Sequence, residues 1–502
     1  LHNVTTAAKI GKNAKINQDA SQVGANGAQD IYVTARDTSV SNVYAGGLAA
    51  GLGGLAGTVD VGVIKTTTSA TIGDGVVMAA KRDVAAIALS NRAGNSVIVS
   101  GAGAVLGVAA AVAIYDYGNG ITPGGEADDK MSDATNGQHS LSDITDQANS
   151  EVDGSSGDGV SSLFEDPDTD PRIKAASDKA QTARDAVTLV TAPDAGLVMP
   201  AGTSANMGSA TIVVGGTIGL RSYDKLSTSM TAGALAAGIA GVGAGIVVQS
   251  VDTTNTAQLS GAANLTAAGL AVNAQTFHAL TANTVVGAAG GFGLVAAASV
   301  ASDDSDTYAY INGATIAVSG GIAVNASSAR SIDSEALGAS FGLAGVAGVS
   351  FTKASLTGTT KASLGTDASG KTTDHGVNIG TSAIRSGSVT LGATSNDLVK
   401  ANTVAAGAGI GFALQGAVAL GDVTTTVATE ISDASIYSNG AITSTAVATN
   451  SATTDAGGAA LSGTFAAGVS LAHSTLDVTV GNDVYGNSVL DGGSVTLGAT
   501  IA

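Results

Sequence analysis

The 502-residue sequence has no cysteine, no tryptophan and only five prolines. Without cysteine the chain forms no disulfide and no thiolate metal site, and this absence is compatible with any compartment. Aromatic residues make up only 3% of the chain, so few large side chains exist to fill a thick core. We therefore expect a thin hydrophobic interior.

Small and apolar residues dominate what is present. The chain has 70 glycines and is 44% hydrophobic. Valine, isoleucine and threonine suit a pleated surface, and glycine and alanine let neighbouring layers approach closely. This composition favours a stack of β-strands over an ordinary globule.

The charge balance is strongly acidic. Forty aspartates and glutamates face 21 lysines and arginines, which gives a formal net charge of −19. Nucleic acids and anionic lipids require clustered basic residues. We therefore expect no nucleic-acid partner.

A motif recurs along the chain at a nearly fixed interval. Residues 209–222 match residues 313–326, so that Ile212 aligns with Ile316 at a distance of two 52-residue steps. Residues 431–446 match 311–326 across one unit of 52 and a longer one of 68, which aligns Ile436 with the same position. A fixed period of this kind predicts a repeat architecture. We expect an all-β fold, a β-solenoid of the right-handed parallel β-helix type built from repeats of about 52 residues.

The repeats divide the chain into four parts. We interpret residues 1–40 as the end of a preceding repeat, 41–116 and 209–502 as solenoid repeats, and 117–208 as an inserted acidic loop region. All five prolines lie in this insertion, which fits because proline interrupts a strand ladder. Pro171 at a helix start predicts a short helix over 171–190. A second, smaller extension is expected at 370–385. If each of about seven units made two coils, the stack would be roughly 70 Å long.

Four of the seven phenylalanines mark one segment of the repeat. Phe292, Phe341, Phe412 and Phe465 each precede small or aliphatic residues at equivalent places in a Gly/Ala run. Stacked repeats would bring the rings into a column, where aromatic neighbours gain about 0.5–1.5 kcal/mol each. We expect a phenylalanine ladder.

The repeat resembles a known group of proteins through a Gly/Ala/Val run, a Thr-rich corner and a strand of the form A-x-I-G-D-G or A-x-I-N-G-A. The matching residues include Thr66–Val76 (TTTSATIGDGV) and Thr307–Ala314 (TYAYINGA). These repeats resemble those of leukotoxin-type filamentous adhesins and, more broadly, filamentous-haemagglutinin-like large bacterial exoproteins. The resemblance implies a β-solenoid shaft, export across the outer membrane of a Gram-negative cell, and roles in attachment, aggregation or matrix formation such as a biofilm.

Catalytic motifs are formally present but lack their context. Gly338-Ala-Ser340-Phe-Gly342 matches the nucleophile elbow G-x-S-x-G, yet the copies of this segment lack the serine. Glycine patterns near Gly51 and Gly291 approach the dinucleotide fingerprint without a following βαβ pattern. The five histidines are scattered and form no ligand pair. We expect no enzyme, no catalytic residue and no cofactor.

One weak metal candidate lies in the insertion. Asp166, Asp168 and Asp170 alternate like the start of a calcium loop, but Pro171 replaces the required glycine and Ser177 stands at position twelve. A solvated acidic loop is the interpretation we prefer, with calcium as the alternative.

Residues 232–248 are apolar enough to suggest a membrane helix, but the run is short, rich in glycine and without flanking basic residues. We expect a buried or self-associating sheet there and no membrane span. Because the sequence begins at Leu1 without a signal pattern, we interpret it as a segment of a longer precursor.

Two functions remain open. The first is the structural shaft of a secreted surface adhesin or extracellular filament that associates laterally or end to end with itself, and also contacts a host or neighbouring cell surface or a polysaccharide. The second is a β-helical polysaccharide-binding or polysaccharide-processing protein that uses the 117–208 insertion, because such a site would need convergent side chains at one level of the stack.

Overall fold

The computed structural model describes residues 2–18, 28–118, 202–372 and 376–502. These residues form an all-β structure of parallel strands, and none of them is helical. The all-β prediction is therefore confirmed. The helix predicted at 171–190 lies outside the described residues.

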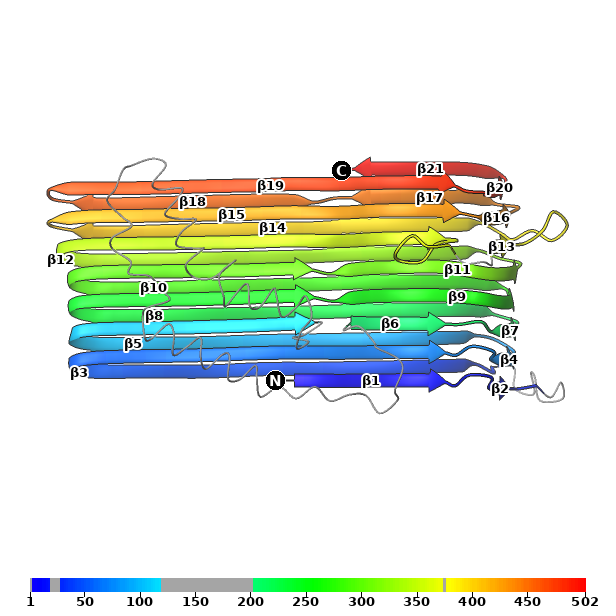
Figure 1. Ribbon diagram of the computed structural model, residues 1–502, viewed down its shortest axis with the longest axis horizontal. Helices are drawn as coiled ribbons and strands as arrows, with labels where there is room; N and C mark the ends of the chain where they lie inside the picture. Colours follow the sequence, from blue (N-terminus) through cyan, green and yellow to red (C-terminus); the bar gives the residue numbers. More distant parts are fainter. Residues whose placement is uncertain (1, 19–27, 119–201, 373–375) are drawn as a thin grey trace.

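Twenty-one strands follow one another along the described chain (Figure 1). They are β1 (His2–Ile10), β2 (Lys15–Ile16), β3 (Ile31–Ile72), β4 (Val77–Ala80), β5 (Val84–Gly118), β6 (Gly202–Met207), β7 (Thr211–Val214), β8 (Thr217–Asp252), β9 (Thr254–Ala267), β10 (Gly269–Asp304), β11 (Asp306–Val318), β12 (Ile322–Leu364), β13 (Val377–Ile379), β14 (Val389–Gly409), β15 (Phe412–Ser432), β16 (Ala434–Tyr437), β17 (Ala441–Ala448), β18 (Ser451–Ser462), β19 (Phe465–Tyr485), β20 (Val489–Asp491) and β21 (Ser494–Ile501).

Each repeat makes one circuit, which we call a coil, and pairs with the next coil in parallel. Leu270 of β10 lies opposite Ile218 of β8 on one side and Ile322 of β12 on the other, one 52-residue step away in each direction. The assumption of two coils per repeat was wrong, because equivalent residues of successive repeats are direct neighbours. With strands about 4.8 Å apart, eight levels span only about 35 Å along the stacking direction.

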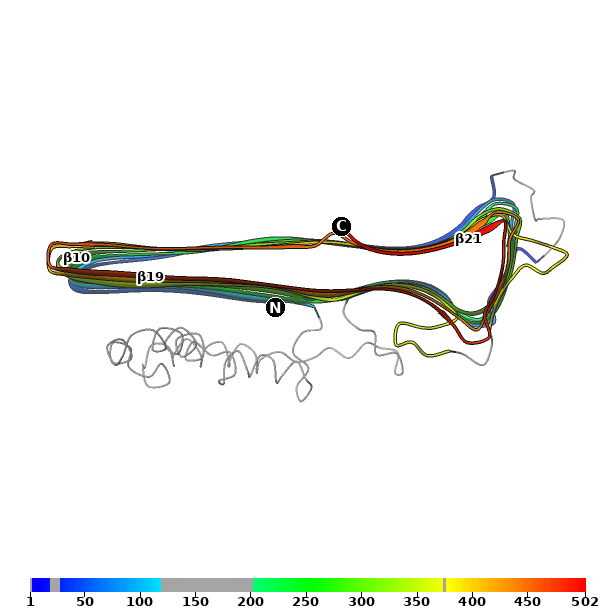
Figure 2. The same ribbon diagram turned by 90° about the horizontal axis from the view of Figure 1, so that it is seen from above.

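Seen along the stacking direction, each coil has a flat part and a wide end (Figure 2). We call the flat part, in which two layers face each other, the blade, and the wide end the head. In the coil that begins at Leu270, residues 275–305 form the blade, and the remaining residues of β10 and β11 form the head. The two parts have separate hydrophobic cores.

The head is filled by columns of aliphatic side chains, one residue from each coil. The column that contains the three predicted isoleucines is Ile16, Met78, Ile212, Leu265, Ile316, Ile379, Ile436 and Leu490. Ile212, Ile316 and Ile436 are fully buried in one core cluster. Their predicted equivalence is confirmed. Alternation along short strands places these residues inward because successive side chains point to opposite faces.

The blade has a core made mainly of alanine. Ala234, Ala282 and Ala336 are among its fully buried members, together with a few larger residues such as Leu280 and Ile332. Small inward side chains let the two layers approach closely, so the Gly/Ala runs of the sequence correspond to the blade.

The insertion leaves and rejoins the sheet without changing the register. Gly118 at the end of β5 pairs with Asp252, and Gly202 at the start of β6 pairs with Thr254. In the next coil a single residue, Thr253, lies between Asp252 and Thr254. The 83 residues from 119 to 201 are therefore inserted at a position that one residue occupies in the next coil. The predicted insertion of 117–208 was too long, because β6 already belongs to the stack. Likewise β3 begins at Ile31, ten residues before the predicted start of the first repeat.

The smaller extension expected at 370–385 lies between β12 and β14. Here the pairing distance in sequence increases to 67 residues, as between Ile322 and Val389. Thr366 and Thr372 form an antiparallel bridge within it, and Ile384 is largely exposed. The extra residues leave the strand pairing on both sides intact.

Candidate functional site

A chain of six charged side chains is buried between the two cores. It crosses five successive coils and consists of Arg92, Asp224, His278, Asp303, Arg330 and Asp397. Each of these residues is at most 3% exposed. We call this set the ionic chain.

The first half of the ionic chain joins three coils. Arg92 Nη2 donates to both carboxylate oxygens of Asp224, at 2.6 and 2.7 Å. Thr253 Oγ1 also donates to Asp224, at 3.3 Å. His278 Nε2 lies 3.7 Å from Asp224 Oδ2, which is an ion-pair distance and too long for a direct hydrogen bond.

The second half continues through the facing layer. His278 Nδ1 lies 2.8 Å from Asp303 Oδ2, and Arg330 Nη1 lies 3.9 Å from Asp303 Oδ1. Arg330 forms a bidentate ion pair with Asp397: Nε and Nη2 of the arginine donate to the two carboxylate oxygens of Asp397, at 3.1 and 2.9 Å. Nη1 of Arg330 also donates to the backbone carbonyls of Ser305 and Thr357. Positive and negative groups therefore alternate along the chain.

Burial and neighbouring charges act in opposite directions on these groups. Burial alone would raise the pKa of Asp224, but Arg92 and His278 lower that pKa well below its usual value. Burial alone would lower the pKa of His278, but the carboxylates of Asp303 and Asp224 raise it above 6.5. The pKa of Asp303 is lowered, mainly by His278, against the effect of burial. The two carboxylates therefore favour the charged form of His278.

The position of the ionic chain follows from strand alternation. Ala274 belongs to the head core and Leu280 to the blade core, and the inward residues between them are Thr276 and His278. Equivalent inward positions in neighbouring coils carry the other polar groups. The ionic chain therefore marks the boundary between head and blade. The insertion joins the sheet at this boundary, since Thr253, which contacts Asp224, occupies in the next coil the position that residues 119–201 take in theirs.

The ionic chain suits a structural role better than a catalytic one. The six charged groups are paired with one another and buried, so no group of the ionic chain is accessible to a substrate. A partly satisfied buried charge is costly, and pairing across coils therefore penalises any shift of one coil against the next. Within the described ranges, no group of three or more His, Asp or Glu side chains could hold a metal ion. Asp166, Asp168 and Asp170 lie outside those ranges.

Ser340 is also buried and structural in its contacts. Its side chain is fully inaccessible, and Gln415 Nε2 donates to its Oγ at 2.8 Å. Because Gln415 cannot act as a general base, this contact provides no activated nucleophile.

The predicted phenylalanine ladder is not formed. Phe412 pairs with Phe465, but Gly345 separates Phe412 from Phe292 in the same column. Phe341 lies in another column, opposite Ala289 and Ala408. The coil reverses direction between these two columns, so residues that look equivalent in sequence lie on opposite layers. None of the ring contacts between described residues joins two of these phenylalanines.

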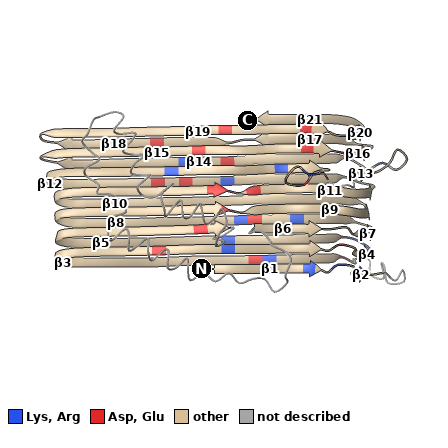
Figure 3. Cartoon of the chain, viewed as in Figure 1, with Lys and Arg blue, Asp and Glu red and all other residues tan. Residues whose placement is uncertain are grey.

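The end of the blade farthest from the head is without charge. The segments that form it contain no Lys, Arg, Asp or Glu in any coil, and Figure 3 shows this part entirely in tan, without blue or red. These segments are 45–57, 97–114, 231–249, 284–301, 336–352, 403–421 and 456–472. Large apolar side chains such as Leu235, Ile239 and Leu343 are mostly exposed there. This surface is the second candidate site.

Comparison with known proteins identifies no relative. The chain matches no family model, no curated protein and no solved structure. Residues 232–248 lie in β8, and none of the described residues forms a helix that could cross a membrane.

The ionic chain was missed by sequence reasoning, although a signal for it exists. His278 and Arg330 are one repeat apart and pair directly, and Asp397 follows in the same column. Charged residues that recur at one inward-facing position of the repeat are unusual, because charged side chains are rarely buried unless they are paired. Aligning the repeats by phase would have shown these three residues together.

Proposed function

We propose that this chain is the structural shaft of a secreted bacterial surface adhesin or extracellular filament. In this proposal the stack is a β-solenoid of the right-handed parallel β-helix type, and it acts through self-association. The observation that supports the proposal most is the unbroken parallel pairing of β3, β5, β8, β10 and β12, in which each coil is held by its neighbours.

The surface favours association over solubility as a monomer. Monomeric proteins rarely expose contiguous apolar patches larger than a few hundred Å². Here an exposed apolar, charge-free surface extends over every coil at the end of the blade. A protein with a net charge of −19 repels its own copies elsewhere, so this surface is where two copies can approach.

The extracellular location and the role in attachment rest on the repeat resemblance. The Thr-rich corner and the A-x-I-G-D-G strand at residues 66–76 are the features that resemble the repeats of filamentous adhesins. Attachment to a host or neighbouring cell surface, aggregation and matrix formation are the activities proposed for the protein.

Sedimentation of the purified chain over a wide concentration range tests self-association, and electron microscopy tests its form. We expect lateral association that increases with concentration. A strict monomer at high concentration would reject the proposal. Antibody labelling of intact cells of the source bacterium tests the location, and signal only after lysis would reject export.

A further inference from the structure

Two neighbouring outward columns on one layer of the blade alternate in size in opposite phase. One column reads Gly46, Val99, Gly233, Val285, and the other reads Leu48, Gly101, Leu235, Gly287, coil by coil. Wherever one column has a large side chain, the other has glycine in the same coil. The pattern is a checkerboard of knobs and holes over four coils.

The alternation ends in the next three coils, where the second column carries only alanine. Leu337 accompanies Ala339, Val404 accompanies Ala406, and Gly457 accompanies Ala459. No position in either column carries a charge. The checkerboard surface therefore consists of these two columns across all seven coils.

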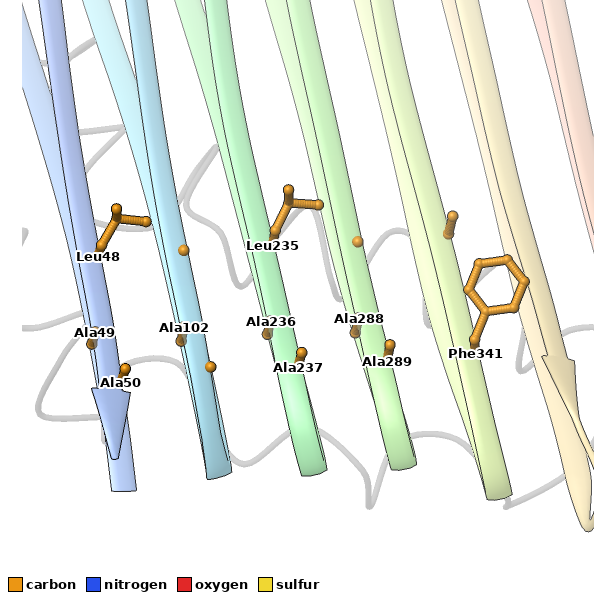
Figure 4. A pocket seen from close by; sticks show the side chains of 14 residues that line it. Leu48, Ala49, Ala50, Ala102, Leu235, Ala236, Ala237, Ala288, Ala289 and Phe341 are labelled. Atoms are coloured by element: carbon orange, nitrogen blue, oxygen red, sulfur yellow. The ribbon is translucent and has the colours of Figure 1, made fainter. Parts of the chain in front are cut away.

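Leu48 and Leu235 of the checkerboard surface project from a shallow apolar groove, which they line (Figure 4). The side chain of Leu48 leans toward Gly101, and that of Leu235 leans toward Gly287, each 2.7 Å from where a Cβ on the glycine would lie. The groove between and beside them is lined by small residues and ends at Phe341. It offers no charged side chain to a polar ligand.

The flatness of the blade points to another flat sheet as the occupant. The two layers run almost straight and without visible twist in Figures 1 and 2. Flat sheets over many strands are unusual and are typically stabilised by stacking. Dry, interdigitated faces between such sheets are the arrangement in which stacking is strongest.

We propose that a second copy of this chain docks on the checkerboard surface, related by a two-fold axis parallel to the stacking direction. This inference rests on the proposed self-association and specifies its surface and symmetry. The axis passes between the two columns, so each residue of one column faces the other column of the partner at the same level. Leu235 then faces glycine 233 of the second copy, and Val285 faces glycine 287. Every large side chain of the first four coils then faces a glycine, and the glycines at 46 and 233, opposite Leu48 and Leu235, are the open holes, because Leu48 and Leu235 themselves lean over Gly101 and Gly287.

The size of the surface is sufficient for a specific dimer. With the charge-free residues beside the two columns included, seven strands about 4.8 Å apart and about seven residues of about 3.3 Å each give a footprint of roughly 650 Å² per copy. The total of roughly 1,300 Å² lies within the range of about 1,200–2,000 Å² for specific interfaces. The adjacent column, which reads Tyr44 and Val97 in the first two coils, is polar from the third coil on, with Thr231, Asn283 and Glu335, and supplies the usual rim.

A knob-and-hole exchange tests the facing pairs. Gly233→Leu fills a hole where a new Cβ lies 3.7 Å from Val99, an ordinary contact, so the monomer should fold. In the dimer the new leucine meets Leu235 of the second copy, and we expect association to weaken at least about tenfold. The double variant Gly233→Leu/Leu235→Gly exchanges knob and hole, and its association should return to within about threefold of the wild type. A mixture of Gly233→Leu with Leu235→Gly should form heterodimers in preference to either homodimer.

Spin labels test the symmetry, since the chain has no cysteine of its own. Tyr44→Cys lies on the first coil and Asp455→Cys on the last, both at exposed positions of the adjacent rim column, where a label does not fill a hole of the checkerboard. Faces packed about 10 Å apart in parallel should bring labels of both variants within about 25 Å of their copies. An antiparallel pair would give long distances at both sites.

The outcomes separate this inference from the proposed function. Val213→Asp, on an exposed residue of β7 outside the groove, is the control and should associate like the wild type. Wild-type association that Gly233→Leu does not weaken, or that the double exchange does not restore, would overturn the inference and leave the shaft proposal standing. A wild-type monomer would overturn both. Uptake of a fluorescent fatty acid by that monomer, lost in Leu235→Asp, would assign the groove to an acyl chain instead.

Discussion

The head and the blade share one backbone ladder but are filled in different ways. In the head, columns such as the one through Ile212, Ile316 and Ile436 fill a wide interior with branched aliphatic side chains. In the blade, alanines such as Ala234 hold two flat layers close together. The difference shows that strand pairing sets the stacking, whereas side-chain volume sets the separation of the layers.

This contrast predicts opposite sensitivities to mutation. A core with large side chains loses stability when a side chain is shortened, and a core of alanines loses stability when a side chain is lengthened. The ionic chain lies between the two cores and belongs to neither. Four changes test this division.

The largest effect is expected at the boundary. Asp224→Ala leaves Arg92 and His278 buried without their shared carboxylate, and we expect a loss of about 3–5 kcal/mol in the free energy of unfolding. Denaturant titration measures it. Asp30→Ala, which breaks the exposed pair with Arg82, is the control and should have a much smaller effect. Equal losses in the two variants would contradict a special role for the boundary.

Shortening a side chain in the head should come next. Ile316→Ala removes a fully buried side chain from the middle of its column, and we expect a loss of about 2–5 kcal/mol. Ile316→Val should cost only about 0.5–1.5 kcal/mol. Thermal and denaturant unfolding of the two variants measures the ratio. A loss below that of the valine variant would show that the head relaxes freely around a cavity.

Lengthening a side chain in the blade should cost somewhat less. Ala234→Leu forces the two layers apart where the side chain is fully buried, and we expect a loss of about 1–3 kcal/mol. The matched control is Ala271→Leu, at an outward, half-buried position of the same layer in the head, which should be nearly neutral. An unchanged Ala234→Leu variant would mean that the blade interior is loosely packed.

The smallest effect is a pH dependence at the boundary. The pKa of His278 is raised above 6.5 in the folded protein, so its charged form adds stability that is fully present below pH 6.5. This contribution is lost as the pH rises through the folded pKa. We expect the free energy of unfolding to fall over that range, and His278→Gln to remove this part of the slope. His473→Gln, at an exposed histidine, should keep it.

Much of the stacking could be predicted from the sequence, because it depends on local alternation and on the repeat period. The alignment of Ile212 with Ile316 required only that inward residues recur at one phase. The number of coils per repeat could not be predicted, since a strand pattern does not show where the chain bends back. The position of Phe341 was mistaken for the same reason, because the bend at the end of the blade lies between it and the next phenylalanine column.

The ionic chain was hidden for a different reason. Asp303 lies on the facing layer from His278, and their 2.8 Å contact depends on how the coil folds back on itself. No spacing within a single repeat indicates that contact. His278 and Arg330 lie side by side in successive coils, so their contact could have been found by aligning the repeats. The contact between His278 and Asp303, which lie on facing layers, required the folded structure.

The insertion of residues 119–201 shows that the number of residues in a coil does not determine the height that the coil adds to the stack. Gly118 and Gly202 return the ladder to register as though one residue stood between them. A coil therefore adds the same height to the stack whether it contains 52 residues or more than twice that number. One level can therefore hold a long insertion while the levels above and below keep their spacing.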